Sequence, residues 1–205
     1  MKTHNAGYLR EADLRAMGAG AVGVNVRVHE SCVLVGLDAM AFGDNVRVDP
    51  FCVLTSAGGA LRVGDFVHLS SHLFLSAGAG VEIGDFCALS VGVRVFSRSD
   101  DYDGDHLTNP TVPADFTAPA GAAPVAIGRH VIVGAGTVIL PGVRLGDGVA
   151  VGAQGLVKED LAAWGVYAGC PAKLVRPRRK AMLDQEIRLR AALADGAVDL
   201  PVAHL

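Results

Sequence analysis

The fold is decided by five consecutive hexads: Ile127-Gly-Arg-His-Val-Ile132, Val133-Gly-Ala-Gly-Thr-Val138, Ile139-Leu-Pro-Gly-Val-Arg144, Leu145-Gly-Asp-Gly-Val-Ala150 and Val151-Gly-Ala-Gln-Gly-Leu156. An aliphatic residue opens each hexad, and Gly follows it in four of the five. Neither the 3.6-residue period of an α-helix nor the two-residue period of a strand produces a strict six. A short strand followed by a tight corner does, and three such units close one triangular coil. The stretch therefore predicts an all-β protein, a parallel β-helix.

The six-residue repeat also occurs upstream, with three hexads in each coil. The coils open at Val22, Phe42, Val63 and Ile83, which are 20, 21 and 20 residues apart. Two or three extra residues must therefore widen one corner of each eighteen-residue coil, and the Gly-rich segments 58–59 and 78–80 suit such a turn. With the two later coils, the sequence predicts about six coils.

A Gly-Asp pair follows the opening residue in several coils, as in Phe42-Gly-Asp44, Val63-Gly-Asp65 and Ile83-Gly-Asp85. We expect the Gly to adopt a left-handed φ at the corner. We expect the Asp to bond the backbone of its own turn.

Three regions follow from this pattern. Residues 1–20 form an N-terminal helical cap, in which Leu9, Leu14 and Met17 have roughly helical spacing and Gly18 ends the helix. Residues 21–177 form the β-helix, interrupted by a loop at 97–126. Residues 178–205 form a C-terminal helix and tail, with an apolar face of Met182, Leu183, Ile187 and Leu189.

The loop at 97–126 adds 26 residues to the coil that contains it, and four prolines exclude another coil. Loops longer than about 12–15 residues in compact domains are usually functional or disordered. This one carries several Asp residues, a Tyr and a His between tightly repeating coils. We therefore expect it to be functional.

Composition excludes several classes of partner. The net charge of -3 gives no support for nucleic-acid or membrane-surface binding. No apolar run approaches about 18 residues, and the N-terminus lacks the layout of a signal peptide, so we expect a cytoplasmic protein. Cys32, Cys52 and Cys87 each occupy the fifth place of a hexad, which predicts interior packing and no metal site.

The hexads, the loop and the segment Tyr167-Ala-Gly-Cys-Pro-Ala-Lys173 together resemble the hexapeptide-repeat acyltransferases over about residues 20–178. These are left-handed β-helix enzymes that transfer an acyl group, usually acetyl from acetyl-CoA, to a hydroxyl or an amine. The resemblance implies the left hand and a homotrimer with active sites between subunits. Within the family the chain looks most like the sugar acetyltransferases. The implied acceptor is the amino group of a nucleotide-linked amino sugar, of the 4-amino-4,6-dideoxy type, for O-antigen or other polysaccharide synthesis.

Five residues match the family's coenzyme A contacts. The resemblance places Ala135 and Ala153 where the backbone meets the pantetheine arm, since a larger side chain would block the tunnel. Lys158 matches a cofactor contact after the coil that contains Ala153. Lys173 and Arg176 match the basic pair that faces the adenosine phosphates.

The catalytic base is where the chain departs from the family. Sugar and xenobiotic acetyltransferases of this fold commonly carry a His at the start of the long loop, often as Thr-His-Pro. Here that place holds Asp100, in Ser99-Asp-Asp-Tyr102. A carboxylate with the ordinary pKa of about 4 is a weak base toward a sugar hydroxyl unless it is buried. Asp100 therefore fits an amino acceptor better, but it equally fits a His supplied from elsewhere.

His72, one coil before the loop, is the second candidate for proton transfer, because family members often place polar acceptor-binding residues in that coil. Ser70 in the same coil is a candidate for substrate binding. In the loop, Asp101, Tyr102 and His106 are candidates for shaping the acceptor pocket.

Two alternatives remain open. One is O-acetylation of a sugar or small xenobiotic. The other is a non-catalytic β-helix that uses its flat faces for binding, as in the related carbonic-anhydrase branch. That branch needs zinc-binding histidines arranged as His followed by His-x-x-x-x-His, and this chain lacks that spacing.

Overall fold

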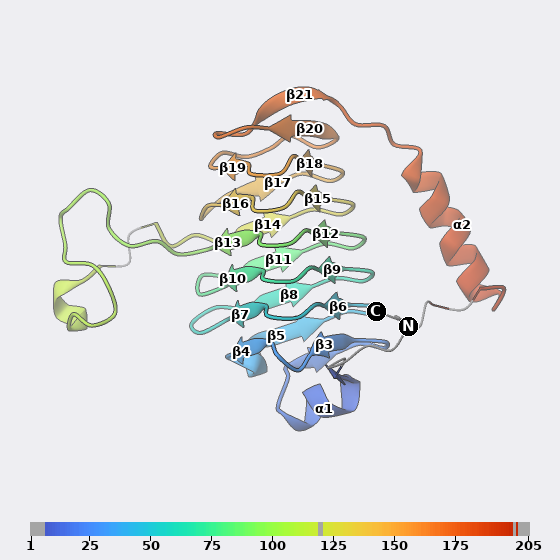
Figure 1. The fold of residues 1–205 in the computed structure, drawn as a ribbon, viewed down its shortest axis with the longest axis horizontal. Coiled ribbons are helices and arrows are strands. Elements are labelled where there is room, and N and C mark those ends of the chain that lie inside the picture. The colour runs from blue at the N-terminus through green and yellow to red at the C-terminus, as the bar shows by residue number, and fades with distance from the viewer. Residues whose placement is uncertain (1–6, 119–120, 199, 201–205) are drawn as a thin grey trace.

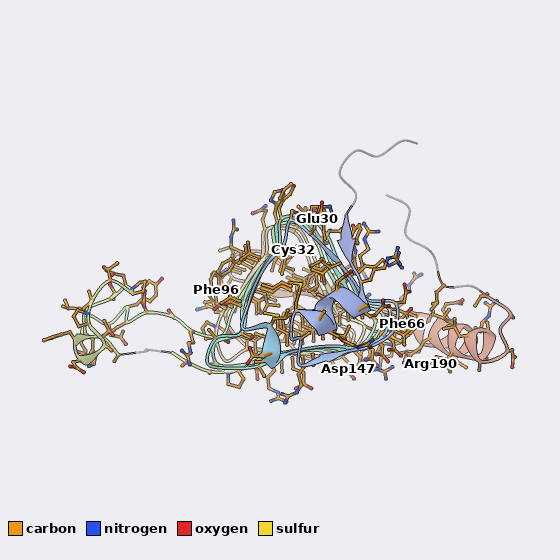
Figure 2. All side chains as sticks on the ribbon, turned by 90° about the horizontal axis from the view of Figure 1, so that it is seen from below. Glu30, Cys32, Phe66, Phe96, Asp147 and Arg190 are labelled. Carbon is orange, nitrogen blue, oxygen red and sulfur yellow. The ribbon has the colours of Figure 1, made fainter. Side chains whose placement is uncertain are left out.

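The chain folds into a parallel β-helix, as the hexads predict (Figure 1). The computed structural model describes residues 7–118, 121–198 and 200. Successive coils stack their strands in register into three sheets, which form the faces of a triangular prism (Figure 2). The arrangement is consistent with the left-handed β-helix of the family that the sequence resembles.

The nine strands of sheet A are β1 (Tyr8–Leu9), β3 (Arg27–His29), β6 (Arg47–Val48), β9 (His68–Leu69), β12 (Ala88–Leu89), β15 (Ile132–Val133), β18 (Ala150–Val151), β20 (Gly165–Ala168) and β21 (Lys173–Pro177). The six strands of sheet B are β2 (Ala21–Val22), β5 (Met40–Phe42), β8 (Leu61–Val63), β11 (Val81–Ile83), β14 (Val125–Ile127) and β17 (Arg144–Leu145). The six strands of sheet C are β4 (Val33–Val35), β7 (Val53–Thr55), β10 (Phe74–Ser76), β13 (Arg94–Phe96), β16 (Val138–Ile139) and β19 (Leu156–Val157).

Each coil runs through sheet B, sheet A and sheet C in turn, so the prism has three edges. We name them the B/A, A/C and C/B edges, after the sheets that the chain leaves and enters. Sheets B and C each contain six strands, which confirms about six coils, and β20 begins a seventh. Both ends of sheet A are closed by an antiparallel strand, β1 against β3 and β21 against β20. These strands cover sheet ends that would otherwise expose unpaired backbone groups.

The core consists mainly of the residues at the first and fifth places of the hexads, and the opening residues pair across adjacent coils. Leu54, for example, lies between Leu34 and Leu75 in sheet C and is fully buried. Of the three interior cysteines that the sequence predicts, Cys52 and Cys87 are buried and Cys32 is half-buried; all are free thiols. Among the described residues, no helix is both long enough and apolar enough to span a membrane.

At the corners of the coils, glycine has a different role from the one expected. Positive φ occurs at the fourth place of the hexad, including Phe66 (57°), Phe86 (58°) and His130 (58°), and not at the Gly of the Gly-Asp pairs. A Cβ added at Gly43 would lie 2.4 Å from Asp65 Oδ1. These glycines are therefore required because the next coil approaches closely. The widened corners do use left-handed glycine, at Gly58 and Gly80, as predicted.

The expectation for the aspartates is also wrong. Asp65 Oδ1 accepts a hydrogen bond from the backbone N–H of Asp44, one coil earlier, at 2.8 Å, and Asp85 does the same for Asp65 at 3.0 Å. Each carboxylate thus bonds the neighbouring coil and not its own turn. The stacking of identical corners creates a partner that a single isolated turn lacks.

The N-terminal cap contains the predicted helix, α1 (Glu11–Ala16), preceded by β1, which the sequence did not indicate. Leu14 is buried, but Met17 is exposed and therefore lies off the apolar face predicted for it. Short 3-10 helices, η1 (Leu37–Ala39) and η2 (Ala114–Phe116), lie at the C/B edge and in the long loop.

The C-terminal helix, α2 (Met182–Ala194), runs along the B/A edge (Figures 1 and 2). Glu186 accepts hydrogen bonds from His130 at 2.6 Å and Arg129 at 2.5 Å, and Arg190 lies over the Phe86 ring. The predicted apolar face needs one correction. Ile187 is 68% exposed, because the ionic contacts orient the helix with Glu186 toward the prism.

Candidate active site

A ladder of polar side chains follows the A/C edge, where the chain leaves sheet A. Strand register places His29, Asp49, Ser70 and Ser90 one above another in successive coils. The next two coils carry Gly134 and Gly152 at this place. Ser90 is therefore the last polar side chain before the glycine-lined half of the edge. Within the described residues, the hydroxyls of Ser70 and Ser90 have no hydrogen-bond partner.

His72 lies at the outer corner of the same edge. It has a φ of 59° and its exposed ring stacks on Phe51, with 5.2 Å between ring centroids. In the next coil this place is Gly92, where an added Cβ would come no closer than 4.0 Å to another atom. The ring of His72 therefore borders an open notch.

The long loop leaves from the C/B edge, across sheet C from His72 (Figure 1). Strand β14 begins at Val125, so the connection ends at 124 and not at 126 as predicted. The buried Ser97 anchors its start. The Ser97 hydroxyl donates to Ser76 O at 2.8 Å and accepts from Ala79 N at 2.9 Å.

Asp100 is exposed and lines a hollow of about 370 Å³ at the base of the loop, together with Arg98, Ser99, Asn109, Pro110, Thr117 and Ala118. Of the predicted site residues, only Asp100 lines this hollow. Its side chain makes no hydrogen bond or ion pair within the described residues, so it is available to a ligand.

Asp101 has a different environment. Its carboxylate accepts hydrogen bonds from the backbone N–H groups of Asp103 at 2.8 Å, Gly104 at 3.1 Å and His106 at 2.7 Å. Hydrogen bonds from these amides and from the His106 ring, led by that from Asp103, lower its pKa against a smaller opposing effect of desolvation. The pair Asp101 and His106 therefore shapes the loop, and Tyr102 between them is 90% exposed.

The five predicted coenzyme A residues fall into two places. Ala135 and Ala153 lie in the glycine-lined half of the A/C edge, in adjacent coils. Lys158 and Lys173 both approach the Glu159 carboxylate, at 3.8 and 3.7 Å. Arg176 lies farther along β21 and is exposed.

One chain does not bring all these groups together. Ser70, His72, Ala135 and Ala153 share the A/C edge, whereas Asp100 belongs to the C/B edge. Figure 2 shows the two corners apart, with Glu30 and Cys32 near one and the loop extending from another. Within one chain, these two sets of predicted residues therefore lie on separate edges of the prism.

Sequence reasoning missed four polar residues of the A/C edge and its border with sheet A: Arg47, Asp49, His68 and Ser90. Asp49 accepts hydrogen bonds from Arg47 Nε at 2.6 Å and from His68 Nε2 at 2.7 Å. Aligning the last residue of the first hexad and the first two residues of the second in every coil would have placed all four beside Ser70.

Comparison with known proteins gives relatives over most of the chain, although no protein-family model matches it. A dTDP-4-amino-4,6-dideoxy-D-glucose acyltransferase of Escherichia coli is 37% identical over 179 residues, which are 87% of this chain and 93% of that protein. The N-acyltransferase AntD of Bacillus cereus, in complex with dTDP and 3-hydroxybutyryl-CoA, matches with a TM-score of 0.87 at 31% identity. That match covers 93% of this chain and 100% of AntD.

Other AntD structures carry a substitution at one serine or at one aspartate ten positions later in that chain. The complex of one serine variant holds dTDP-4-amino-4,6-dideoxyglucose and coenzyme A. It is 30% identical, with a TM-score of 0.86, over 91% of this chain and 98% of that one. A hexapeptide-repeat acetyltransferase of Vibrio cholerae shares the fold at 20% identity, with a TM-score of 0.55, over 86% of this chain and 85% of that one.

Proposed function

This chain belongs to the hexapeptide-repeat acyltransferases, and on that premise we propose that it acylates the 4-amino group of a nucleotide-linked 4-amino-4,6-dideoxy sugar, with an acyl-coenzyme A as donor. The observation that carries the proposal is the near full-length match to an Escherichia coli enzyme named for that acceptor. The match extends over 87% of this chain and 93% of that enzyme, so it is not limited to a few repeats.

A serine–aspartate pair supports the site. Ser90 is the only serine in the chain with an aspartate ten positions later, and that aspartate is Asp100. This is the spacing of the two residues replaced in the AntD variants. We therefore propose Asp100 as the group that accepts the proton, with Ser90 positioning the acceptor beside it.

The chemistry suits an amine. The neutral amino nitrogen attacks the thioester carbonyl, the C–N bond forms and the C–S bond breaks. The nitrogen loses one proton, which Asp100 accepts and which then protonates the departing thiolate of coenzyme A. A neutral amine is already nucleophilic, so a carboxylate suffices where a sugar hydroxyl would need a stronger base. His72 remains a proposed second proton carrier, and Ser70, Tyr102 and His106 remain proposed acceptor contacts.

We propose a homotrimer because the outward face of sheet C is apolar and because Ser90 and Asp100 lie on different edges of one chain. On this face Val33 is 51% exposed and Phe74 packs against Phe96. A second copy seated on this face would cover it and would bring its own loop toward the first copy's A/C edge. Asp100 of one copy would then meet Ser90 of another.

The donor is proposed to enter from the opposite end of the same edge. Ala135 and Ala153 would border the pantetheine arm, and Lys158, Lys173 and Arg176 would contact the phosphates at the C-terminal end of the prism. We propose acetyl as the acyl group. The 3-hydroxybutyryl group is the second candidate, because AntD is seen with 3-hydroxybutyryl-CoA. The role in polysaccharide synthesis and the cytoplasmic location stay predictions.

The test is release of free coenzyme A, detected as thiol. Acetyl-CoA and 3-hydroxybutyryl-CoA are each offered with dTDP-4-amino-4,6-dideoxyglucose and with its 4-hydroxy counterpart. We expect turnover with the amino sugar and at least about 100-fold less with the hydroxy sugar. Faster turnover of the hydroxy sugar would replace this proposal with O-acylation. No turnover of either, and no thermal shift with acyl-CoA, would favour a binding protein.

A further inference from the structure

We propose that Arg47 and His68, held by Asp49, bind the diphosphate of the nucleotide-linked acceptor. The inference rests on the proposed function for the identity of the ligand. The three residues form one cluster at the border between the outer face of sheet A and the A/C edge. None of them belongs to the sites predicted for acyl transfer or for coenzyme A.

The cluster is built by strand register. Arg47 in β6 is the direct cross-strand partner of His68 in β9, so both side chains leave the outer face of sheet A in adjacent coils. Asp49 follows β6 at the edge, and its two carboxylate oxygens each bind one of them, at 2.6 and 2.7 Å. The carboxylate is 10% exposed, whereas Arg47 is 27% and His68 44% exposed. Arg47 and the His68 ring thus face solvent, and the Asp49 carboxylate lies beneath them.

The hydrogen bonds to Asp49 use one nitrogen of each side chain. Asp49 engages Nε of Arg47, and Tyr8, whose hydroxyl bonds Asp49 Oδ1 at 3.4 Å, also contacts Arg47. In the proposal the terminal guanidinium nitrogens bind the phosphate. Asp49 engages Nε2 of His68, which leaves Nδ1. Burial alone would raise the pKa of Asp49, but the hydrogen bonds from His68 and Arg47 hold it below its ordinary value. Asp49 therefore stays ionised and fixes both side chains, and a fixed guanidinium suits bidentate phosphate binding.

The distance from the proposed reaction centre fits the ligand. Coils are about 4.8 Å apart, so His68 lies one coil and Arg47 two coils, about 10 Å, from Ser90 along the prism. In a 4-amino sugar with a diphosphate on C1, single bonds of about 1.5 Å put the two phosphorus atoms roughly 6 to 9 Å from the amino nitrogen. An amine placed at Ser90 therefore places its diphosphate at the Arg47–His68 level.

The direction in which the acceptor would extend from Ser90 is also consistent with the proposed position of coenzyme A. Coenzyme A is proposed on the glycine-lined half of the edge, on the C-terminal side of Ser90, so the acceptor must extend toward the N-terminal coils. Ala88, which lies between His68 and Ile132 in sheet A, has a small side chain beside Ser90. No large side chain of sheet A therefore separates Arg47 and His68 from the proposed reaction centre.

The experiment measures the affinity of the full-length protein for dTDP, dTMP and coenzyme A by calorimetry. Arg47→Gln should weaken dTDP binding by about tenfold or more, and Arg47→Lys, which keeps the charge but loses the planar fork, by less. His68→Gln, which still reaches Asp49 with an amide donor, should weaken it several-fold. Binding of dTMP should change less, and coenzyme A, whose diphosphate is proposed to bind elsewhere, should keep its affinity.

Arg62→Gln is the matched control, since Arg62 is an exposed arginine on the outer face of sheet B, in β8. Unchanged dTDP affinity in both Arg47 variants and in His68→Gln, in protein that still turns over the amino sugar, would overturn the assignment. So would an equal loss in Arg62→Gln, or a parallel loss of coenzyme A affinity. If the wild-type chain neither binds dTDP nor releases coenzyme A, the proposed function itself fails instead.

Discussion

Asp100 and Asp101 are adjacent in sequence but differ in what their carboxylates contact. Asp101 is satisfied by three backbone amides of its own loop, whereas Asp100 faces the hollow at the base of the loop. The sequence assigns them different roles, but it does not show that their carboxylates have different partners. The structure separates a residue that shapes the loop from one that is available for chemistry.

At this scale the prediction is that Asp100→Asn lowers kcat by about 100-fold or more with a smaller change in KM, because an amide cannot accept the proton. The measurement is steady-state release of coenzyme A with the amino sugar. Asp105→Asn is the control, since it removes the same charge from the same loop. Full activity in Asp100→Asn would remove this residue from the mechanism.

Among the elements, α2 depends on a few polar contacts. His130 is 7% exposed, stacks on Phe86 with 5.1 Å between centroids, and bonds Glu186. Arg190 also bonds Glu186, at 2.8 Å. No residue of α2 is fully buried, so these charged contacts position the helix together with the half-buried Met182, Leu183 and Leu189.

Glu186→Gln should therefore release α2 from the prism while leaving the coils folded. Hydrogen exchange of the α2 amides should quicken by about ten-fold or more, since a hydrogen bond to a charged group contributes roughly 1.5–3 kcal/mol. The control is Asp184→Asn, an exposed acidic residue of the same helix. Unchanged exchange in Glu186→Gln would show that other contacts hold the helix.

The same contact predicts a pH dependence. Burial opposes the charge of Glu186, but hydrogen bonds from Arg190 and His130 and nearby positive charges hold its pKa below the ordinary 4.5. The stabilisation of docked α2 by Glu186 is thus fully present above about pH 4.5. It is lost as the pH falls through the lower pKa that Glu186 has when α2 is docked. In the wild-type protein α2 should therefore leave the prism only in acid, and Glu186→Gln should not show this pH dependence.

For the whole molecule, the separation of Ser90 and Asp100 onto two edges predicts complementation between inactive chains. Ser90→Ala and Asp100→Ala should each be nearly inactive alone. In randomly mixed trimers one interface in each mixed trimer regains both residues, so about a quarter of the wild-type activity should return. The measurement is coenzyme A release after co-refolding or co-expression. Mixtures no more active than their parents would place the site within one chain or show that the chains do not associate.

The sequence by itself determined the fold, because each six-residue repeat encodes one short strand and one corner. It also located the loop, and Asp100 within it, because the loop is where the period breaks. It assigned the wrong reason to Gly43 and Asp65, since their partners belong to the neighbouring coil and cannot be seen in one repeat.

Only the tertiary structure decided which side chains share an edge. Arg47, Asp49, His68 and Ser90 are spread over more than forty positions of sequence, and stacking in register brings them together within three coils. The structure also places Asp100 on a different edge from His72. The two residues are 28 positions apart, and the sequence between them does not indicate that they lie on different edges. The physical reason is that the chain returns to the same edge once in each coil, so residues one coil apart are neighbours, whereas residues closer in sequence can lie on different edges.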